Sequence, residues 1–156
     1  MKKLIPFLCA AIIITLAACG SKGETALKPG DSMSLEGIFE SILRDVDNLP
    51  EVSYVEVTPE NIHYYLFTEQ IEGSEALACD SLINAVPHSA VLLRVPEGTD
   101  TAAVAQDIEK NADPRKWICV GADKTIVKVH GNTILLVMSF TETADEIAAN
   151  FDKLWE

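Results

Sequence analysis

Basic side chains are scarce in this sequence, whose 156 residues include 12 Lys and Arg against 24 Asp and Glu. The formal net charge is −12 at pH 7. A surface of that sign repels the phosphates of nucleic acids and the headgroups of anionic lipids. We therefore expect no nucleic-acid partner.

Histidine is also scarce, and the three that occur lack the spacing of a metal site. His63, His88 and His130 form no i, i+4 pair and have no Cys-x-x-Cys motif beside them. The sequence contains neither Gly-x-Ser-x-Gly nor a glycine-rich phosphate loop. These absences predict a domain with no metal, no cofactor and no standard catalytic centre.

Only four cysteines are present, and two of them, Cys9 and Cys19, lie in or at the end of the N-terminal apolar run. Cys79 and Cys119 remain for the folded part. We favour two free thiols, because free cysteines are commonly buried as small apolar side chains and a core of this size needs no cross-link. A Cys79–Cys119 disulfide, which an exported chain permits, is the alternative. A thiol nucleophile needs a thiolate with a supporting neighbour, and the candidates are Cys79 beside Asp80 and Cys119 near Arg115 and Lys116. A buried cysteine in a strand is the favoured interpretation.

The N-terminus has the parts of a secretory signal. Lys2 and Lys3 give it a positive start, and residues 4–18 are apolar apart from Pro6 and Thr15. As a helix this run would reach roughly 22 Å, short of the ~30 Å hydrocarbon core of a bilayer. We predict a signal peptide over residues 1–18 rather than a permanent transmembrane helix.

The run ends in Leu16-Ala17-Ala18-Cys19, which resembles the lipobox of bacterial lipoproteins. The resemblance implies cleavage between Ala18 and Cys19 and a diacylglyceryl group on the Cys19 sulfur. Two acyl chains anchor a protein stably, whereas one binds a membrane only marginally. The expected location is the extracytoplasmic face of the cell membrane, with the lipid membrane as a partner through Cys19. An ordinary signal peptide with an incidental Cys19 is the alternative.

The rest of the chain divides into a tether and one domain. Residues 19–34 are rich in Gly, Ser and charged side chains without apolar periodicity, which predicts a lipidated flexible tether. Residues 35–156 form a single domain, because this length buries one core but would leave two domains too small.

An amphipathic helix opens the domain. Ser34 is a good N-cap, and apolar residues recur at helical spacing over residues 35–46, before Pro50. Residues 52–57 alternate only weakly, so either a short edge strand or an extended link fits them. A short helix is expected over residues 59–66.

A strand, a second strand and a helix follow. Apolar runs over residues 76–83 and 89–95 predict a hairpin. The helix after it begins near residues 99–101 and ends before Pro114, whose ring excludes helical angles at the preceding residue.

The same order of elements then occurs again. Runs over residues 125–129 and 133–140 flank Gly131-Asn132, a pair that fits a type II′ hairpin turn. The second run is apolar on both faces, which predicts a strand covered on both sides. Thr143 and Glu146 suggest a capping box for the last helix. The predicted fold is α+β, with an antiparallel four-stranded sheet from two hairpins, each followed by a helix, and an N-terminal amphipathic helix.

Several short motifs together resemble the domain of unknown function 4358 family of small bacterial lipoproteins. These motifs are Pro114-Arg115-Lys116-Trp117-Ile118-Cys119-Val120-Gly121, Leu49-Pro50, Val95-Pro96 and the Gly131-Asn132 hairpin with its apolar second strand. The resemblance covers the whole folded part and implies a lipid-anchored location. It carries over no catalytic residues.

The most distinctive polar stretch is Arg115-Lys116-Trp117, where two cations adjoin an indole in an acidic domain. It is a candidate contact for an anion or for an envelope protein partner. The competing interpretation is a surface pair of cations with Trp117 in the core. We therefore expect a membrane-anchored extracytoplasmic lipoprotein whose domain binds a partner without catalysis. The alternatives are a thiol- or carboxylate-dependent envelope enzyme and a lipoprotein that binds a small ligand or metal.

Overall fold

The computed structural model describes residues 27–156, so the predicted signal peptide, the cleavage site at Ala18 and Cys19, and the first part of the predicted tether lie outside the described residues. Five helices and five strands make up this part of the chain. In order they are α1 (Pro29–Ser32), α2 (Leu35–Ile42), β1 (Val52–Glu56), α3 (Ile62–Tyr65), β2 (Glu75–Ser81), β3 (Ser89–Arg94), α4 (Thr101–Asn111), β4 (Lys124–His130), β5 (Thr133–Ser139) and α5 (Thr141–Lys153).

The strands form one antiparallel sheet in the order β1-β2-β3-β5-β4. The mixed helix and strand fold agrees with the α+β prediction, but the prediction of four strands is wrong. The fifth strand is β1, which pairs with β2 from Val52 opposite Ser81 to Glu56 opposite Leu77. As an edge strand, β1 is half exposed and has no fully buried side chain, which explains its weak sequence signal.

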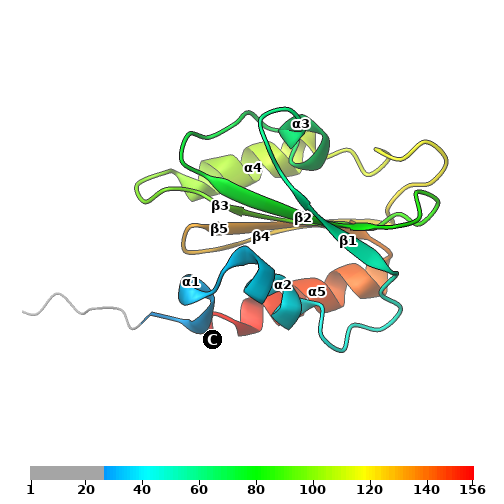
Figure 1. Ribbon diagram of the computed structural model, residues 1–156, viewed down its shortest axis with the longest axis horizontal. Coiled ribbons are helices and arrows are strands. Elements are labelled where there is room, and N and C mark those ends of the chain that lie inside the picture. Colours follow the sequence, from blue (N-terminus) through cyan, green and yellow to red (C-terminus); the bar gives the residue numbers. More distant parts are fainter. Residues whose placement is uncertain (1–26) are drawn as a thin grey trace, which may run out of the picture.

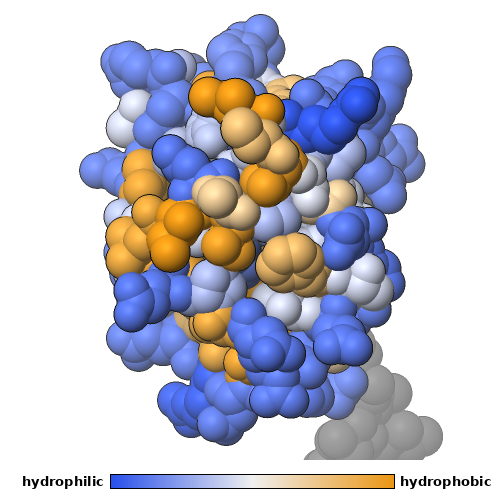
Figure 2. All heavy atoms as spheres, turned by 90° about the vertical axis from the view of Figure 1, so that its right-hand side faces the viewer, coloured by the Kyte–Doolittle hydropathy of each residue, from blue (hydrophilic) through white to orange (hydrophobic). Residues whose placement is uncertain are grey.

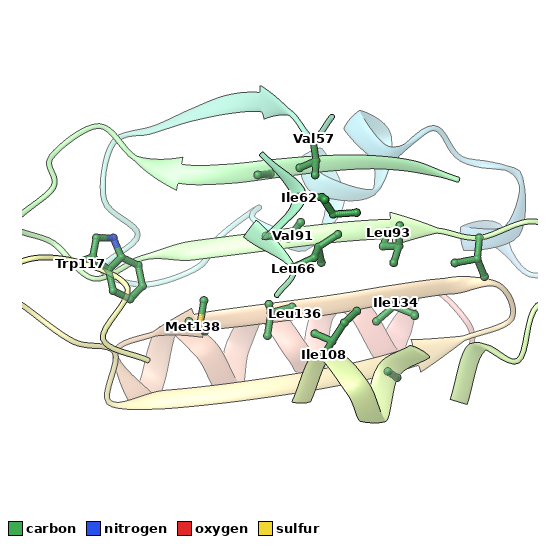
Figure 3. Close-up of a cluster of buried hydrophobic side chains, with 13 residues drawn as sticks. Val57, Ile62, Leu66, Val91, Leu93, Ile108, Trp117, Ile134, Leu136 and Met138 are labelled. Carbon is green, nitrogen blue, oxygen red and sulfur yellow. The ribbon is translucent and has the colours of Figure 1, made fainter. Parts of the chain in front are cut away.

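Helices cover both faces of the sheet, which gives three layers (Figure 1). α3 and α4 pack on one face, where a buried cluster includes Ile62, Ile108 and Trp117, as Figure 3 shows. α2 and α5 pack on the other face around Phe39 and Phe151. β3 and β5 lie between the layers, and all seven residues of β5 are buried. The prediction of a strand covered on both sides is therefore confirmed.

The second hairpin has the predicted two-residue turn. His130 pairs with Thr133, which leaves Gly131 and Asn132 as the loop. Gly131 adopts a φ of 57°, in the region that a type II′ turn requires at its first central position and that favours glycine.

The two predicted helix caps have different outcomes. The Ser34 side chain accepts a hydrogen bond from the Gly37 N–H, 3.1 Å away, as an N-cap should. The capping box of Thr143 and Glu146 is wrong, because α5 begins earlier, at Thr141. Glu146 instead accepts a hydrogen bond from the backbone N–H of Asp47 at 2.8 Å, so it holds the loop after α2.

The prediction of a flexible tether over residues 19–34 is also wrong for its described part, residues 27–34. α1 packs against the C-terminus, where Gly30 is buried and donates its N–H to the Leu154 carbonyl at 3.1 Å. The Trp155 indole N–H donates to Asp31 at 2.7 Å, and the Lys28 ammonium donates to the terminal Glu156 oxygen at 2.6 Å. These contacts join α1 to residues 154–156, so the folded domain includes the chain from Lys28 onward.

Candidate functional site

The register of the sheet places three connections at one of its ends. β2 ends where β3 begins, with Asp80 opposite Ser89, and β5 ends where β4 begins, with Ser139 opposite Lys124. The β2–β3 connection, the segment 112–123 after α4 and the start of α5 therefore lie together. This is the right-hand end in Figure 1.

Exposed hydrophobic side chains concentrate at this end. Ile118 is fully exposed, and Leu82 and Ile83 are exposed by 59% and 58%. Tyr64 of α3 and Phe140 before α5 are the other exposed large side chains of the same region. We call these five side chains the apolar end. Figure 2 views it directly and shows hydrophobic atoms gathered in a patch with hydrophilic side chains around it.

A pocket of about 420 Å³ opens within the apolar end. Its volume is within the usual range of ligand sites. The residues that line it come from α3, the β2–β3 connection and the segment after α4: Tyr64, Asn84, Ala85, Lys116, Trp117, Ile118 and Cys119.

Lys116 turns inward beside this pocket. Its side chain is only 3% exposed, and its ammonium donates a hydrogen bond to the Ser89 hydroxyl at 2.8 Å and lies 3.8 Å from the Asp80 carboxylate. The rings of Tyr64 and Tyr65 lie 4.5 and 5.0 Å from the same ammonium, a cation–π arrangement. Burial lowers the pKa of Lys116 to about 8, and the Asp80 carboxylate partly opposes this shift.

Asp80 and His88 complete a buried polar cluster behind Lys116. Burial raises the pKa of Asp80, against the effect of the Lys116 charge. The His88 ring is fully buried and its Nδ1 lies 3.0 Å from the Ser139 hydroxyl. Burial and the Lys116 charge lower the pKa of His88 to about 4, so the ring is neutral at pH 7. Asp80 Oδ1 and His88 Nε2 have no hydrogen-bond partner among the described residues.

The predicted contact of Arg115, Lys116 and Trp117 is not one surface. Arg115 is exposed, Lys116 points inward, and Trp117 is only 8% exposed and belongs to the core cluster. Figure 3 shows Trp117 at the end of that cluster away from Leu93. The competing interpretation, with Trp117 in the core, therefore describes the indole correctly but not Lys116.

The two cysteines lie in different surroundings. Cys79 is buried on the face of the sheet that α2 and α5 cover, and burial raises its pKa to about 12. Cys119 is exposed and lines the pocket. Both are free thiols in the structure. Because the thiolate is the nucleophile, a thiol with the pKa of Cys79 is poorly suited to catalysis.

The histidines are dispersed. His63 lies at the surface near Glu69, His88 is buried, and His130 lies 2.9 Å from Asp152 near α5. Within residues 27–156 no group of three His, Cys, Asp or Glu side chains is arranged to hold a metal ion.

Sequence reasoning missed the main members of this site. Leu82 and Ile83 extend an apolar run and were therefore expected in a strand, but β2 ends at Ser81. Asp80 and Ser89 meet Lys116 only through the fold, because they lie 36 and 27 residues from it in the sequence. The one available signal was the pair Asn84 and Pro87. Both residue types favour turns, so they indicate that β2 ends shortly before residue 84.

None of the helices in residues 27–156 combines the length and the apolar character that a bilayer span requires. Comparisons with family models, curated proteins and solved structures give no match to this chain.

Proposed function

We propose that this protein is a lipid-anchored extracytoplasmic binding domain, held on the cell membrane through Cys19, that contacts an envelope protein with its apolar end. The predicted signal peptide and the lipobox-like residues before Cys19 support the anchor. The resemblance to the domain of unknown function 4358 family is part of the same proposal.

The distribution of exposed hydrophobic side chains carries the binding function. Eight large hydrophobic side chains are exposed among the described residues, and five of them form the apolar end. Single exposed apolar side chains are ordinary, whereas a contiguous patch with a polar border marks an interaction site. The remaining three lie in separate parts of the chain, with Leu27 before α1, Tyr54 in β1 and Val129 in β4.

The other candidate functions receive less support from the geometry. A thiol enzyme needs a histidine or another base beside an accessible sulfur, but Cys79 is enclosed and the three described histidines bond elsewhere or lie at the surface. A carboxylate enzyme based on Asp80 would need substrate to displace Lys116. A small-ligand function is favoured by the pocket itself, and its apolar lining would suit an apolar molecule.

The anchor is tested with the change Cys19→Ser. We expect the variant to leave the membrane fraction or to remain unprocessed, because it lacks the sulfur that forms the thioether. Intact-mass measurement of the wild-type protein from its native host should show a chain that begins at Cys19 with a diacylglyceryl group. A native protein with an unmodified Cys19 thiol would contradict the anchor.

The binding surface is tested by photo-cross-linking in native membranes. A photoreactive residue at position 118 should give a defined cross-linked protein, and the same residue at position 27 should not. Leu27 is the matched control because it is also exposed, at 81%, but lies next to α1. A band that persists when Leu82→Ser is added would contradict recognition by the apolar end.

A further inference from the structure

We infer that the apolar end binds a polypeptide segment that carries large apolar side chains flanked by Lys or Arg. This inference rests on the proposed binding function and deepens it by naming the chemistry of the partner. Charge, extent and position of the surface each support it.

The first support is a rim of carboxylates around the apolar end. Glu51, Asp113, Asp123 and Glu142 are exposed at this end of the sheet. Their placement follows from the chain. The Glu51 carbonyl accepts a hydrogen bond from the Leu82 N–H, and Asp113 lies in the segment after α4. Asp123 directly precedes Lys124, and Glu142 is two residues after Phe140. We call these four carboxylates the acidic rim. None of them forms an ion pair with any described cation.

The cations of this end do not neutralise the acidic rim. Lys116 is enclosed with Asp80, and Lys124 pairs with Asp145 at 2.6 Å. Arg115 is the exposed cation left in the segment after α4. The apolar end therefore has an apolar centre and an edge of unpaired negative charge. Opposite charges on two surfaces speed their association, and like charges oppose it. This surface favours a partner whose edge is positively charged.

The second support is the extent of the surface. The pocket is lined by Tyr64 and Ile118, but Leu82, Ile83 and Phe140 lie outside it. A small molecule that filled the pocket would leave these three side chains in water. A polypeptide segment can place one side chain in the pocket and cover the neighbouring connections with the next ones.

The third support is position, which disfavours a membrane surface and a second copy as occupants. α1 is fixed at the opposite end of the sheet, where Arg94 donates to the Met33 carbonyl at 2.8 Å. Cys19 is only eight residues before Leu27, so a lipid at Cys19 would tether the domain from that opposite end and not from the apolar end. Two copies that met end to end would also bring two acidic rims together.

The experiment uses the full lipidated chain in nanodiscs of neutral phosphatidylcholine, with empty nanodiscs as the blank. Calorimetry compares the peptide Lys-Leu-Lys-Phe-Lys-Leu-Lys with its counterpart that has Glu at every Lys position. We expect the basic peptide to bind, more weakly at high salt, and the acidic peptide not to bind.

Matched variants assign the binding to this surface. Leu82→Ser and Ile118→Ser should each lower the affinity for the basic peptide about tenfold. This is the loss expected for a contact near the centre of an interface. Leu27→Ser, the same change at the opposite end, should leave binding unchanged. Asp123→Asn combined with Glu142→Gln should weaken binding at low salt, whereas Glu97→Gln, an exposed carboxylate after β3, should not.

Four results would overturn the inference, and three of them come from the binding and sedimentation measurements. These three are equal binding of the acidic peptide, binding that is insensitive to Leu82→Ser and Ile118→Ser, and a dimer in sedimentation that Leu82→Ser dissolves. A small apolar ligand retained by the native protein would also overturn it. These failures are distinguishable from failure of the proposed function, because the cross-link at position 118 would persist with a partner of different charge.

Discussion

The Lys116 ammonium lies 3.8 Å from the Asp80 carboxylate, and the two side chains are only 3% and 16% exposed. This ion pair connects the segment after α4 to β2, and Ser89 of β3 completes the contact. Loss of one member of such a pair leaves the other charge enclosed without compensation, which costs far more than loss of a surface pair.

We therefore expect Asp80→Asn to lower the free energy of unfolding by about 3 kcal/mol at pH 7. Asp145→Asn is the control, because its pair with Lys124 is about half exposed and should contribute less than about 1 kcal/mol. Urea denaturation measures both. Equal effects of the two changes would show that the Asp80–Lys116 pair is not electrostatically enclosed.

The buried neutral state of His88 predicts a loss of stability in acid. Its pKa is about 4 in the folded protein against 6.5 for the free side chain, so between these values the unfolded chain binds the proton more readily. The free energy of unfolding should therefore fall as pH drops from about 6.5 to about 4, by about 3 kcal/mol from this group.

The variant His88→Gln isolates that contribution. Glutamine binds no proton, so the free energy of unfolding of the variant should rise relative to that of the wild type as pH falls from 7 towards 4. Above pH 7 the difference between the two proteins should be constant. Thermal unfolding over this pH range provides the measurement. Parallel pH profiles for the two proteins would rule out a buried neutral His88.

The two free thiols should differ in reactivity. Iodoacetamide without reductant should modify the exposed Cys119 in the folded protein, and it should reach Cys79 only after denaturation, because Cys79 is buried with a pKa of about 12. Peptide mapping by mass spectrometry locates each adduct. Protection of both sites until reductant is added would instead indicate the Cys79–Cys119 disulfide.

The close approach of α1 to the C-terminus predicts an effect of Gly30→Ala. A Cβ at Gly30 would overlap the Trp155 indole, so we expect a loss of about 1–3 kcal/mol and faster hydrogen exchange in α1. Gly37→Ala is the matched control. It lies in α2, where the nearest atom to a new Cβ is 3.4 Å away, and it should stabilise the helix by about 0.5–1 kcal/mol.

The sequence was most informative where hydrophobic runs were long and turns were well defined. The buried strands β3 and β5 and the Gly131-Asn132 turn follow from such signals. β1 was ambiguous because an edge strand buries too little for a clear alternation. The predicted first helix was too long, because Asp45 and Asn48 adopt φ values near 60° and turn the chain after Ile42.

The candidate site was less predictable, and Lys116 shows why. A lysine beside an arginine suggests an exposed cation, since lysine is seldom buried without a partner. Its partners Asp80 and Ser89 come from another hairpin, so only the register of β2 and β3 brings them near. The sequence analysis identified the correct segment but could not show that the Lys116 side chain points inward.

The attachment of α1 beside the C-terminus also has a mechanical consequence. If the membrane holds the chain at Lys28 and a partner holds the opposite end, tension acts along the strands of the sheet. The hydrogen bonds between β3 and β5 are perpendicular to that direction, so the load is shared by the whole ladder at once instead of opening one bond after another. With the proposed anchor and the proposed partner in place, a pulling force between them would therefore load this ladder in shear.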